Sequence, residues 1–285
     1  MNQGNEPLFD IVTLIGPNEN DQISTQIGYT KKNIIGYRNI YLICYDPTIK
    51  VDGCITINEN IFPFDKETVE KYHKKPNRQK LYNRNGWYLQ QLLKLYAGRI
   101  IPNILDKYLV IDSDTFFLKK TTFIKDNKCL YNYANPECGW NKSYFDHMSK
   151  LDKNFIKSSD HSGICHHMIF EKKYIDEIFS IVETNHNDYF YNIFLKEVDV
   201  SILSGASEYE IYFNYMLKNN YDKIQIRKLK YIEPMWSDYR MLKNDTSYDY
   251  ICYHIYKNNK KKDLNKLVYN SSGGSTKEGK AKKNK

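Results

Sequence analysis

The chain has 285 residues and a formal net charge of +8, from 42 Lys and Arg against 34 Asp and Glu. Residues 257–285 contain ten Lys and two acidic residues, so this segment carries the whole excess, and residues 1–256 hold 32 of each sign. A nucleic-acid-binding domain carries its positive charge on the folded part, so this distribution argues against a specific nucleic-acid binder.

The composition is that of a globular protein, with 41% hydrophobic residues. Residues 1–256 are enough for one large α/β domain, and the Lys-, Asn- and Ser-rich residues 257–285 are predicted to be disordered. The six Cys contain no C-x-x-C pair, which argues against a zinc ribbon, and a disulfide framework is not expected in a chain of this length. We find no signal-peptide pattern and no apolar run of about 18 residues, so we expect a cytoplasmic protein without a membrane span.

In the first half of the chain, short apolar runs alternate with helical patterns. The clearest helix has Leu89, Leu92, Leu93 and Tyr96 on one face, and Gly98 is expected to cap its C-terminal end. Strands separated by helices favour an α/β fold with a mostly parallel central sheet. The predicted elements are strand 10–15, helix 19–31, strands 39–45 and 54–57, helices 65–75 and 85–97, and strand 107–111.

The second half of the body continues the alternation without an internal repeat. The predicted elements are strands 128–133 and 163–170, helices 171–184, 189–198 and 207–218, and strands 223–229 and 248–256.

Asp112 and Asp114 are the sharpest chemical feature, because they directly follow the apolar strand 107–111. Two carboxylates in an apolar setting need a compensating partner. Residues i and i+2 of a strand point to the same side, so both could bind one divalent cation at the carboxyl edge of the sheet. The alternative is that the pair caps a turn.

Two enzyme classes place a D-x-D motif after a strand. In haloacid-dehalogenase-like phosphatases the D-x-D-x-T motif follows the first strand, whereas here Thr115 comes one position early and about a hundred residues precede the motif. In GT-A glycosyltransferases a nucleotide-binding half precedes the D-x-D motif. The position of the motif fits the second class.

Residues 8–256 resemble the GT-A glycosyltransferases, and most closely the uncharacterised glycosyltransferase-like proteins of bacteria and large DNA viruses. The resemblance is carried by the order of four segments. These are 86–95 (GWYLQQLLKL), 109–115 (LVIDSDT), 162–170 (SGICHHMIF) and 205–212 (GASEYEIY).

The resemblance implies a GT-A fold and a site for Mn²⁺ or Mg²⁺ and a UDP-sugar. Asp114 would bind the metal directly, Asp112 would contact the ribose or reach the metal through water, and His254 would be the third protein residue at the metal. The segment that begins at His254 lacks the glycine of the family's H-x-x-G-x-x-K pattern. The alternative is that His254 is an ordinary strand residue without a metal. The donor would also contact Gly16, Pro17, Asn18, Arg84, Gln91, Ser113 and His167; Arg84 could equally belong to a solvated loop.

Two acidic residues open the predicted helix 207–218. Ser207 and Glu210 form a capping-box pattern, which gives Glu210 a structural explanation. In inverting GT-A enzymes an acidic residue at this helix start acts as general base, so Glu208 is preferred for this catalytic role and Glu210 is the alternative. Of the adjacent His166 and His167, only one can reach the cleft, because neighbouring strand residues face opposite sides.

The sequence therefore predicts a metal-dependent glycosyltransferase, of the hexosyl or N-acetylhexosaminyl type, that uses a nucleoside-diphosphate sugar and a hydroxyl acceptor on a glycan or protein. The alternatives are a metal-dependent phosphohydrolase and a non-catalytic glycan-binding protein. The basic segment 257–285 is expected to tether the protein weakly to anionic surfaces.

Overall fold

The computed structural model describes residues 8–17, 20–73, 84–134, 142–202, 204–233, 245 and 247–253. A five-stranded sheet with the order β10-β5-β1-β3-β4 lies at its centre. Strands β5, β1, β3 and β4 are parallel, and β10 runs antiparallel beside β5. These strands are β1 (Phe9–Ile15), β3 (Tyr37–Cys44), β4 (Ile55–Asn58), β5 (Lys107–Ile111) and β10 (His167–Glu171).

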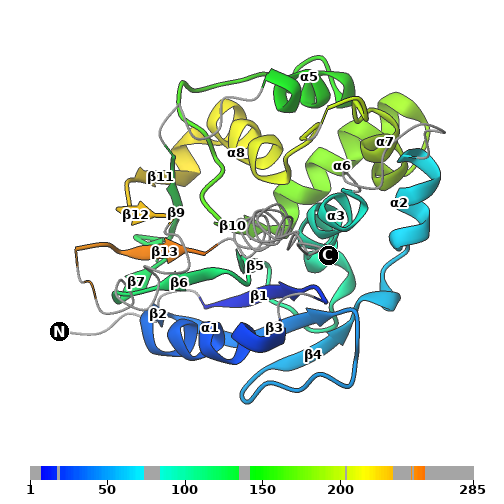
Figure 1. Cartoon of the computed structure of the whole chain (residues 1–285). Helices are drawn as coiled ribbons and strands as arrows, with labels where there is room; N and C mark the ends of the chain where they lie inside the picture. The colour runs from blue at the N-terminus through cyan, green and yellow to red at the C-terminus, as the bar shows by residue number, and fades with distance from the viewer. Residues whose placement is uncertain are drawn as a thin grey trace, which may run out of the picture.

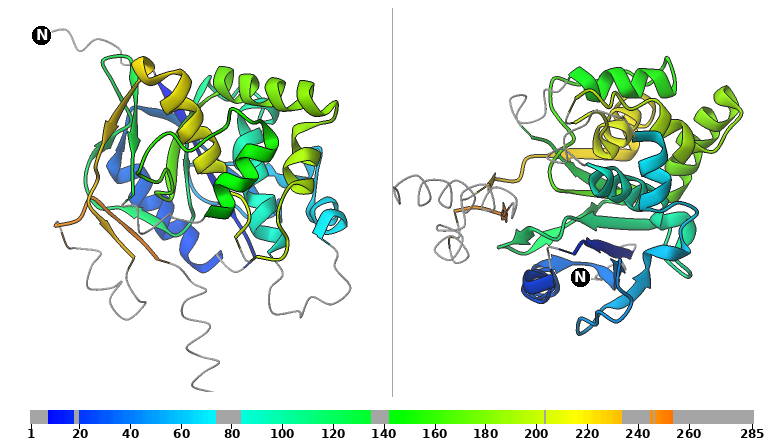
Figure 2. Two further views of the ribbon diagram at one scale, coloured as in Figure 1. Left: turned by 90° about the horizontal axis from the view of Figure 1, so that it is seen from above. Right: turned by 45° about the vertical axis from the view of Figure 1, so that its right-hand side comes forward.

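Helices cover both faces of this sheet. Figures 1 and 2 show α1 on one side, and α3, α6, α7 and α8 on the other. The helices are α1 (Asn20–Asn33), α2 (Lys66–His73), α3 (Asn85–Ile100), α5 (Lys142–Leu151), α6 (Lys172–His186), α7 (Phe190–Lys196) and α8 (Glu208–Asn219), with 3-10 turns η1 (Glu59–Ile61) and η3 (Tyr221–Lys223). The expected α/β class with a mostly parallel central sheet is confirmed.

Three small sheets extend the central one. Their orders are β12-β13-β6, β11-β9-β8 and β2-β7. The strands are β2 (Ile34–Ile35), β6 (Thr115–Phe117), β7 (Thr121–Thr122), β8 (Ile124–Lys125), β9 (Lys128–Asn132), β11 (Ile224–Arg227), β12 (Tyr231–Ile232) and β13 (Tyr250–Cys252). The first of these sheets joins β6, directly after the D-x-D motif, to the last strand of the described body (Figure 1).

The central strands are apolar because both of their faces are buried. All seven residues of β1 and the last four of β5 are buried, as expected of parallel strands with helices on both sides. The buried carboxylate of Asp10 in β1 is satisfied by the guanidinium of Arg38, with Nη2 and Oδ2 2.6 Å apart, and by the amides of Asn39 and Leu105. This acidic residue stabilises the opposite end of the sheet from the D-x-D motif.

The predicted end of the third helix at Gly98 is wrong, because α3 continues through Gly98 to Ile100. A Cβ atom at position 98 would lie 2.7 Å from Cε1 of Tyr108 and 2.9 Å from Cγ of Lys172. Glycine is therefore required by the close packing of α3 on β5 and α6, and not by a left-handed cap.

One predicted strand begins later than expected, and one helix of the structure was not predicted. The strand expected at 163–170 begins only at His167, because His166 adopts a left-handed backbone conformation with φ of 61°. Helix α5 was not predicted, although it buries His147, Met148 and Leu151.

The described residues give two further facts about the environment. Their five Cys are all free thiols. Within the same ranges, no helix combines the length and apolar character that crossing a membrane requires.

Candidate active site

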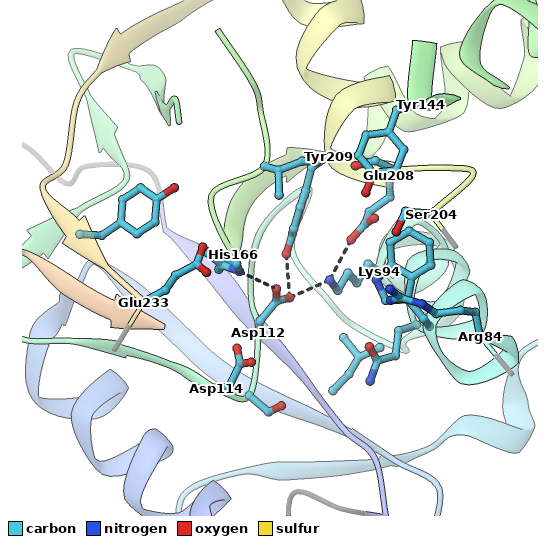
Figure 3. A pocket seen from close by; sticks show the side chains of 17 residues that line it. Arg84, Lys94, Asp112, Asp114, Tyr144, His166, Ser204, Glu208, Tyr209 and Glu233 are labelled. Carbon is cyan, nitrogen blue, oxygen red and sulfur yellow. Dashed lines mark hydrogen bonds and ion pairs between the residues drawn. The ribbon is translucent and has the colours of Figure 1, made fainter. Parts of the chain in front are cut away.

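A cavity of about 410 Å³ opens at the carboxyl edge of the central sheet. It lies where β1 and β5 end, with Leu14 from β1 and the D-x-D residues after β5 in its wall. Figure 3 shows acidic and basic side chains from several elements converging on it. The lining residues also include Arg84, Trp87, Gln90, Lys94, Tyr144, His166, Ser204, Ser207, Glu208, Tyr209, Tyr231 and Glu233.

The D-x-D segment is a tight turn at the end of β5. The amide of Asp112 donates to the carbonyl of His166 at 3.0 Å, which extends the pairing of β5 with β10 by one step. The amide of Thr115 donates back to the carbonyl of Asp112, also at 3.0 Å, and β6 begins there. The turn places Asp112, Ser113 and Asp114 in the cavity wall.

Lys94 from α3 links two carboxylates in this cavity. Its Nζ lies 2.7 Å from Oδ1 of Asp112 and 2.8 Å from Oε1 of Glu208, and 4.5 Å from the centre of the Tyr209 ring. The hydroxyl of Tyr209 donates to the same Oδ1 of Asp112 at 2.9 Å. Only 9% of the Lys94 side chain is exposed, so these contacts compensate a buried charge.

The charges explain the pKa shifts in this cluster. Burial works to raise the pKa of Asp112, but the Lys94 ammonium and the His166 imidazole outweigh burial and hold this pKa well below its usual range. Burial likewise works to lower the pKa of Lys94, but its two carboxylate partners raise it. For Glu208, burial outweighs Lys94, so its pKa is raised above that of an exposed glutamate.

His166 faces Asp112 across the cavity. Its Nδ1 lies 3.8 Å from Oδ2 of Asp112, and its Nε2 lies 3.3 Å from Oε1 of Glu233. Burial works to lower the pKa of His166, but the neighbouring Cys252, Asp112 and Glu233 raise it well above the usual value.

Asp112, Asp114 and His166 could hold a metal ion. Each offers one ligand atom, and these three atoms lie within 4.8 Å of one another. Two metal–ligand bonds of about 2.1–2.6 Å span up to roughly 5 Å, so one divalent ion could contact all three residues. Within the described part of the chain, no other such group of His, Cys, Asp or Glu is found.

The two glutamates at the start of α8 differ in their surroundings. Glu208 lines the cavity, and its amide donates to Oε1 of Gln91 at 3.2 Å. Glu210 is fully buried and does not line the cavity, because its carboxylate accepts hydrogen bonds from Ser162 and Asn214. The side chain of Ser207 caps the helix by accepting from the amide of Glu210 at 3.3 Å, so half of the expected capping box is formed.

A family model described as a family of unknown function, DUF6492, matches residues 29–263, which is most of the chain and includes every described residue of the cavity wall except Leu14. The chain belongs to the DUF6492 family. No curated protein matches its sequence.

The DUF6492 protein is also similar to a solved structure, that of the galactosyltransferase LgtC in complex with donor and acceptor sugar analogues. The two share 12% sequence identity, over 86% of this chain and 87% of the other, with a TM-score of 0.43. A likeness at this level shows neither the substrate nor the activity of the DUF6492 protein.

The structure brings together some of the residues for which a donor contact was predicted. Arg84, Ser113 and both aspartates line the cavity. Gly16 and Pro17 follow β1 but do not line the cavity. Gln91 is buried behind Glu208, while its neighbour Gln90 lines the cavity. Asn18 and His254 lie outside the described residues.

His167, for which a donor contact was predicted, does not line the cavity, because its side chain points into the core of the DUF6492 protein. Its ring packs against those of Phe117, Phe123 and Tyr250, and burial lowers its pKa to about 3. The two histidines do face opposite sides, as their adjacency predicts, but His166 is the one that reaches the cavity.

Sequence reasoning assigned no role to Lys94, Tyr209 or Glu233. A signal was present for Lys94, because it stands between Leu93 and Leu95 in a helix whose residues 91–98 are all buried. A lysine at such a position needs an acidic partner. No comparable signal marks Glu233, which directly follows the short strand β12 and reaches the cavity through the packing of that strand.

Proposed function

We propose that this protein is a metal-dependent glycosyltransferase that moves a sugar from a nucleoside-diphosphate donor, UDP-linked, to a hydroxyl acceptor on a glycan or protein. One observation carries the proposal. A cation-binding group of Asp112, Asp114 and His166 and a buried carboxylate of raised pKa, Glu208, line the same cavity at the carboxyl edge of the sheet.

The donor set supports Mn²⁺ better than Mg²⁺. Carboxylates suit both ions, but Mg²⁺ prefers oxygen ligands throughout, whereas an imidazole nitrogen suits a first-row transition metal. Bound by Asp112, Asp114 and His166, such an ion supplies Lewis-acid neutralisation of the donor diphosphate. The neutral charge of residues 1–256 is consistent with a need for this added positive charge.

Glu208 is the proposed general base. In the transfer, the bond between the anomeric carbon and the phosphate oxygen breaks, and UDP leaves with the bonding electrons. The acceptor oxygen forms the new bond to the anomeric carbon, and its proton passes to the Glu208 carboxylate. A base of raised pKa holds this proton better than an exposed glutamate does.

Lys94 and Gln91 hold Glu208 for this role. Lys94 binds its Oε1, which leaves Oε2 for the acceptor hydroxyl. Oε1 of Gln91 accepts a hydrogen bond from the backbone amide of Glu208. Because both contacts come from α3, the base is fixed relative to the sheet and the D-x-D turn.

The opposite end of the cavity from Glu233 supports a sugar substrate. Trp87 and Tyr144 line it with ring centres 6.5 Å apart, and the guanidinium of Arg84 lies over the Trp87 ring at 4.9 Å. Figure 3 shows Tyr144, Arg84 and Ser204 on the Glu208 side of the site. Aromatic faces with a few polar groups suit a sugar ring, whose faces carry C–H groups and whose rim carries hydroxyls.

The phosphohydrolase alternative finds less support. It needs the threonine of the motif at the phosphate, but Thr115 is fully buried, does not line the cavity and has its hydroxyl 3.5 Å from Sγ of Cys252.

Calorimetric titration with UDP tests the proposal. We expect binding that requires Mn²⁺ and that is lost in Asp114→Asn. Asp106→Asn is the matched control, because the Asp106 side chain is 96% exposed and lies outside the cavity wall. UDP binding of equal strength without metal would contradict the assigned role of Asp114.

A screen of UDP-, GDP- and CDP-sugars for slow donor hydrolysis then tests catalysis. We expect turnover of a UDP-sugar with Mn²⁺. Hydrolysis of a simple phosphate ester without turnover of any nucleotide sugar would instead establish the phosphohydrolase, and glycan binding without either activity would establish the non-catalytic alternative.

A further inference from the structure

The two oxygens of Asp112 have different surroundings. Oδ1 is held by the ammonium of Lys94 at 2.7 Å and by the hydroxyl of Tyr209 at 2.9 Å. Oδ2 is turned to the other side, toward Nδ1 of His166 at 3.8 Å. One oxygen is thus fixed by Lys94 and Tyr209, and the other faces His166, which belongs to the same group that could hold a cation.

The two ring nitrogens of His166 are divided in the same way. Nε2 lies 3.3 Å from Oε1 of Glu233, and Nδ1 lies 3.8 Å from Oδ2 of Asp112. Figure 3 shows Glu233 beyond His166, on the far side from Asp112. The side chain of His166 is 12% exposed and that of Glu233 is 32% exposed, so this contact lies at the rim of the cavity.

In the absence of a cation, the carboxylates around His166 favour its protonated form, so a metal ion that binds this ring displaces one proton. The neutral imidazole that remains has one N–H group and one lone pair, and the partner of one nitrogen decides which nitrogen keeps the proton. A carboxylate accepts hydrogen bonds only, so Glu233 selects the form with the proton on Nε2. The lone pair is then on Nδ1, which is the atom that faces Oδ2 of Asp112. Carboxylate partners of metal-binding histidines act in this manner in many metal sites.

We propose that Glu233 is a positioning residue that holds His166 with Nδ1 directed at the divalent cation, so that the site is a carboxylate–histidine–metal arrangement. The inference rests on the cation site of the proposed function, but not on sugar transfer. It also assigns His166 as a direct ligand, a role for which only His254 was expected from the sequence.

The small sheet explains how Glu233 comes to this place. It directly follows β12, whose partner β13 pairs in turn with β6, the strand after the D-x-D turn. The Tyr231 ring stacks on that of Tyr250 with centres 4.8 Å apart and planes at 6°. The segment with Glu233 is therefore fixed to the same sheet as the D-x-D turn.

Titration with Mn²⁺ alone, followed by electron paramagnetic resonance of the free ion, measures the affinity without any donor or turnover. We expect Glu233→Ala to weaken Mn²⁺ binding by about 10- to 100-fold, the usual loss for such a partner. Glu233→Gln should lose much less, because its amide oxygen can still accept the Nε2 proton. Glu70→Gln, an exposed glutamate on α2, is the control and should bind as the wild type does.

Nitrogen NMR of the imidazoles with Zn²⁺, a diamagnetic probe, gives a readout that a general structural role would not move. In the wild type, Nδ1 of His166 should bind the metal and Nε2 should keep its proton. In Glu233→Ala, the two nitrogens should no longer be distinguished in this way. His166→Ala provides the assignment of the signals.

Three results would overturn the inference. One is wild-type Mn²⁺ affinity in Glu233→Ala or His166→Ala, and another is metal binding through Nε2 of His166. The third is an equal loss in Glu233→Gln and Glu233→Ala with Nε2 still protonated, which would make Glu233 a direct ligand. Loss of Mn²⁺ binding in His254→Ala, with wild-type affinity in His166→Ala, would be a case of the first result and would contradict the inference.

The outcome is separable from that of the proposed function. A protein that binds Mn²⁺ through Nδ1 of His166 but hydrolyses no nucleotide sugar contradicts the function and leaves the inference standing. A protein that turns over a UDP-sugar with Mn²⁺ equally well after His166→Ala contradicts the inference and leaves the function standing.

Discussion

Replacing Lys94 by Met tests the central ion cluster. The change removes an ammonium that lies within 2.8 Å of both Asp112 and Glu208, and it preserves most of the aliphatic volume of the side chain. Two carboxylates are then left in the cavity wall, of which that of Glu208 is only 5% exposed, without their shared cation. Breaking a buried ion pair in this way costs about 3–5 kcal/mol.

For a domain of this size, each kcal/mol lowers Tm by about 2–4 °C, so we expect a fall of roughly 10 °C near neutral pH. Lys142→Met is the matched control. Lys142 is 83% exposed and pairs with Asp146 one turn along α5, and such surface pairs contribute about 0.5 kcal/mol or less.

The stability deficit of Lys94→Met should depend on pH. In the wild type the pKa of Asp112 lies below its unfolded value of about 3.9, so Asp112 contributes stability above that pH, and this contribution is lost as the pH falls. In Lys94→Met, the pKa of Asp112 rises, although His166 still lowers it, and the pKa of Glu208, already raised by burial, rises further, so the folded variant takes up protons. Its deficit should therefore be largest near pH 7 and shrink toward about pH 4.

Urea unfolding of both proteins at about pH 7.5 and about pH 4 measures the deficit at each pH. A variant within about 1 kcal/mol of the wild type at the higher pH would show that the cluster does not stabilise the fold. A deficit that is the same at both pH values would show that lost packing, and not uncompensated charge, is the cause.

Three further outcomes are expected. Glu208→Gln should lower turnover by about 10²- to 10⁴-fold with UDP binding retained. Because burial raises the Glu208 pKa and a base must be deprotonated, the acid limb of kcat/KM in the wild type should lie above the pH of an exposed glutamate, about 4.3, and Glu208→Gln should lack it. Gly98→Ala should reduce the free energy of unfolding by about 1–3 kcal/mol, since the new Cβ meets the buried Tyr108 ring; an unchanged or higher Tm would show that α3 shifts freely. Deletion of residues 257–285 should weaken sedimentation with anionic vesicles in a salt-dependent manner and leave donor turnover unchanged; equal vesicle binding would place the attraction elsewhere.

The central sheet could be predicted from the sequence because its strands are buried on both faces. Residues 107–111 form an uninterrupted apolar run, and the abrupt change to Asp112 marks the carboxyl edge of the sheet. The class of the fold and the position of the D-x-D turn follow from these local patterns.

The composition of the site was less accessible, because it depends on backbone geometry and long-range packing. The left-handed backbone conformation of His166 directs its side chain into the cavity, while the side chain of His167 points into the core. The two side chains are chemically identical, so their chemistry does not show which one reaches the cavity. In the same way, helix phase decides that Gln90 lines the cavity while Gln91 is buried under Glu208. Such choices between neighbours are fixed by tertiary contacts that a single sequence does not display.

The amide of Tyr253, the last described residue, donates a hydrogen bond to the carbonyl of Asp114 at 2.7 Å, and β13 pairs with β6 directly before it. We therefore expect the D-x-D turn and β13 to open and close together, as one cooperative unit in hydrogen exchange. The amides of Ile251 to Tyr253 should exchange at the rate of those in β6, and a divalent ion held at Asp114 should slow both. Occupancy of the site and the order of β13 should thus be coupled.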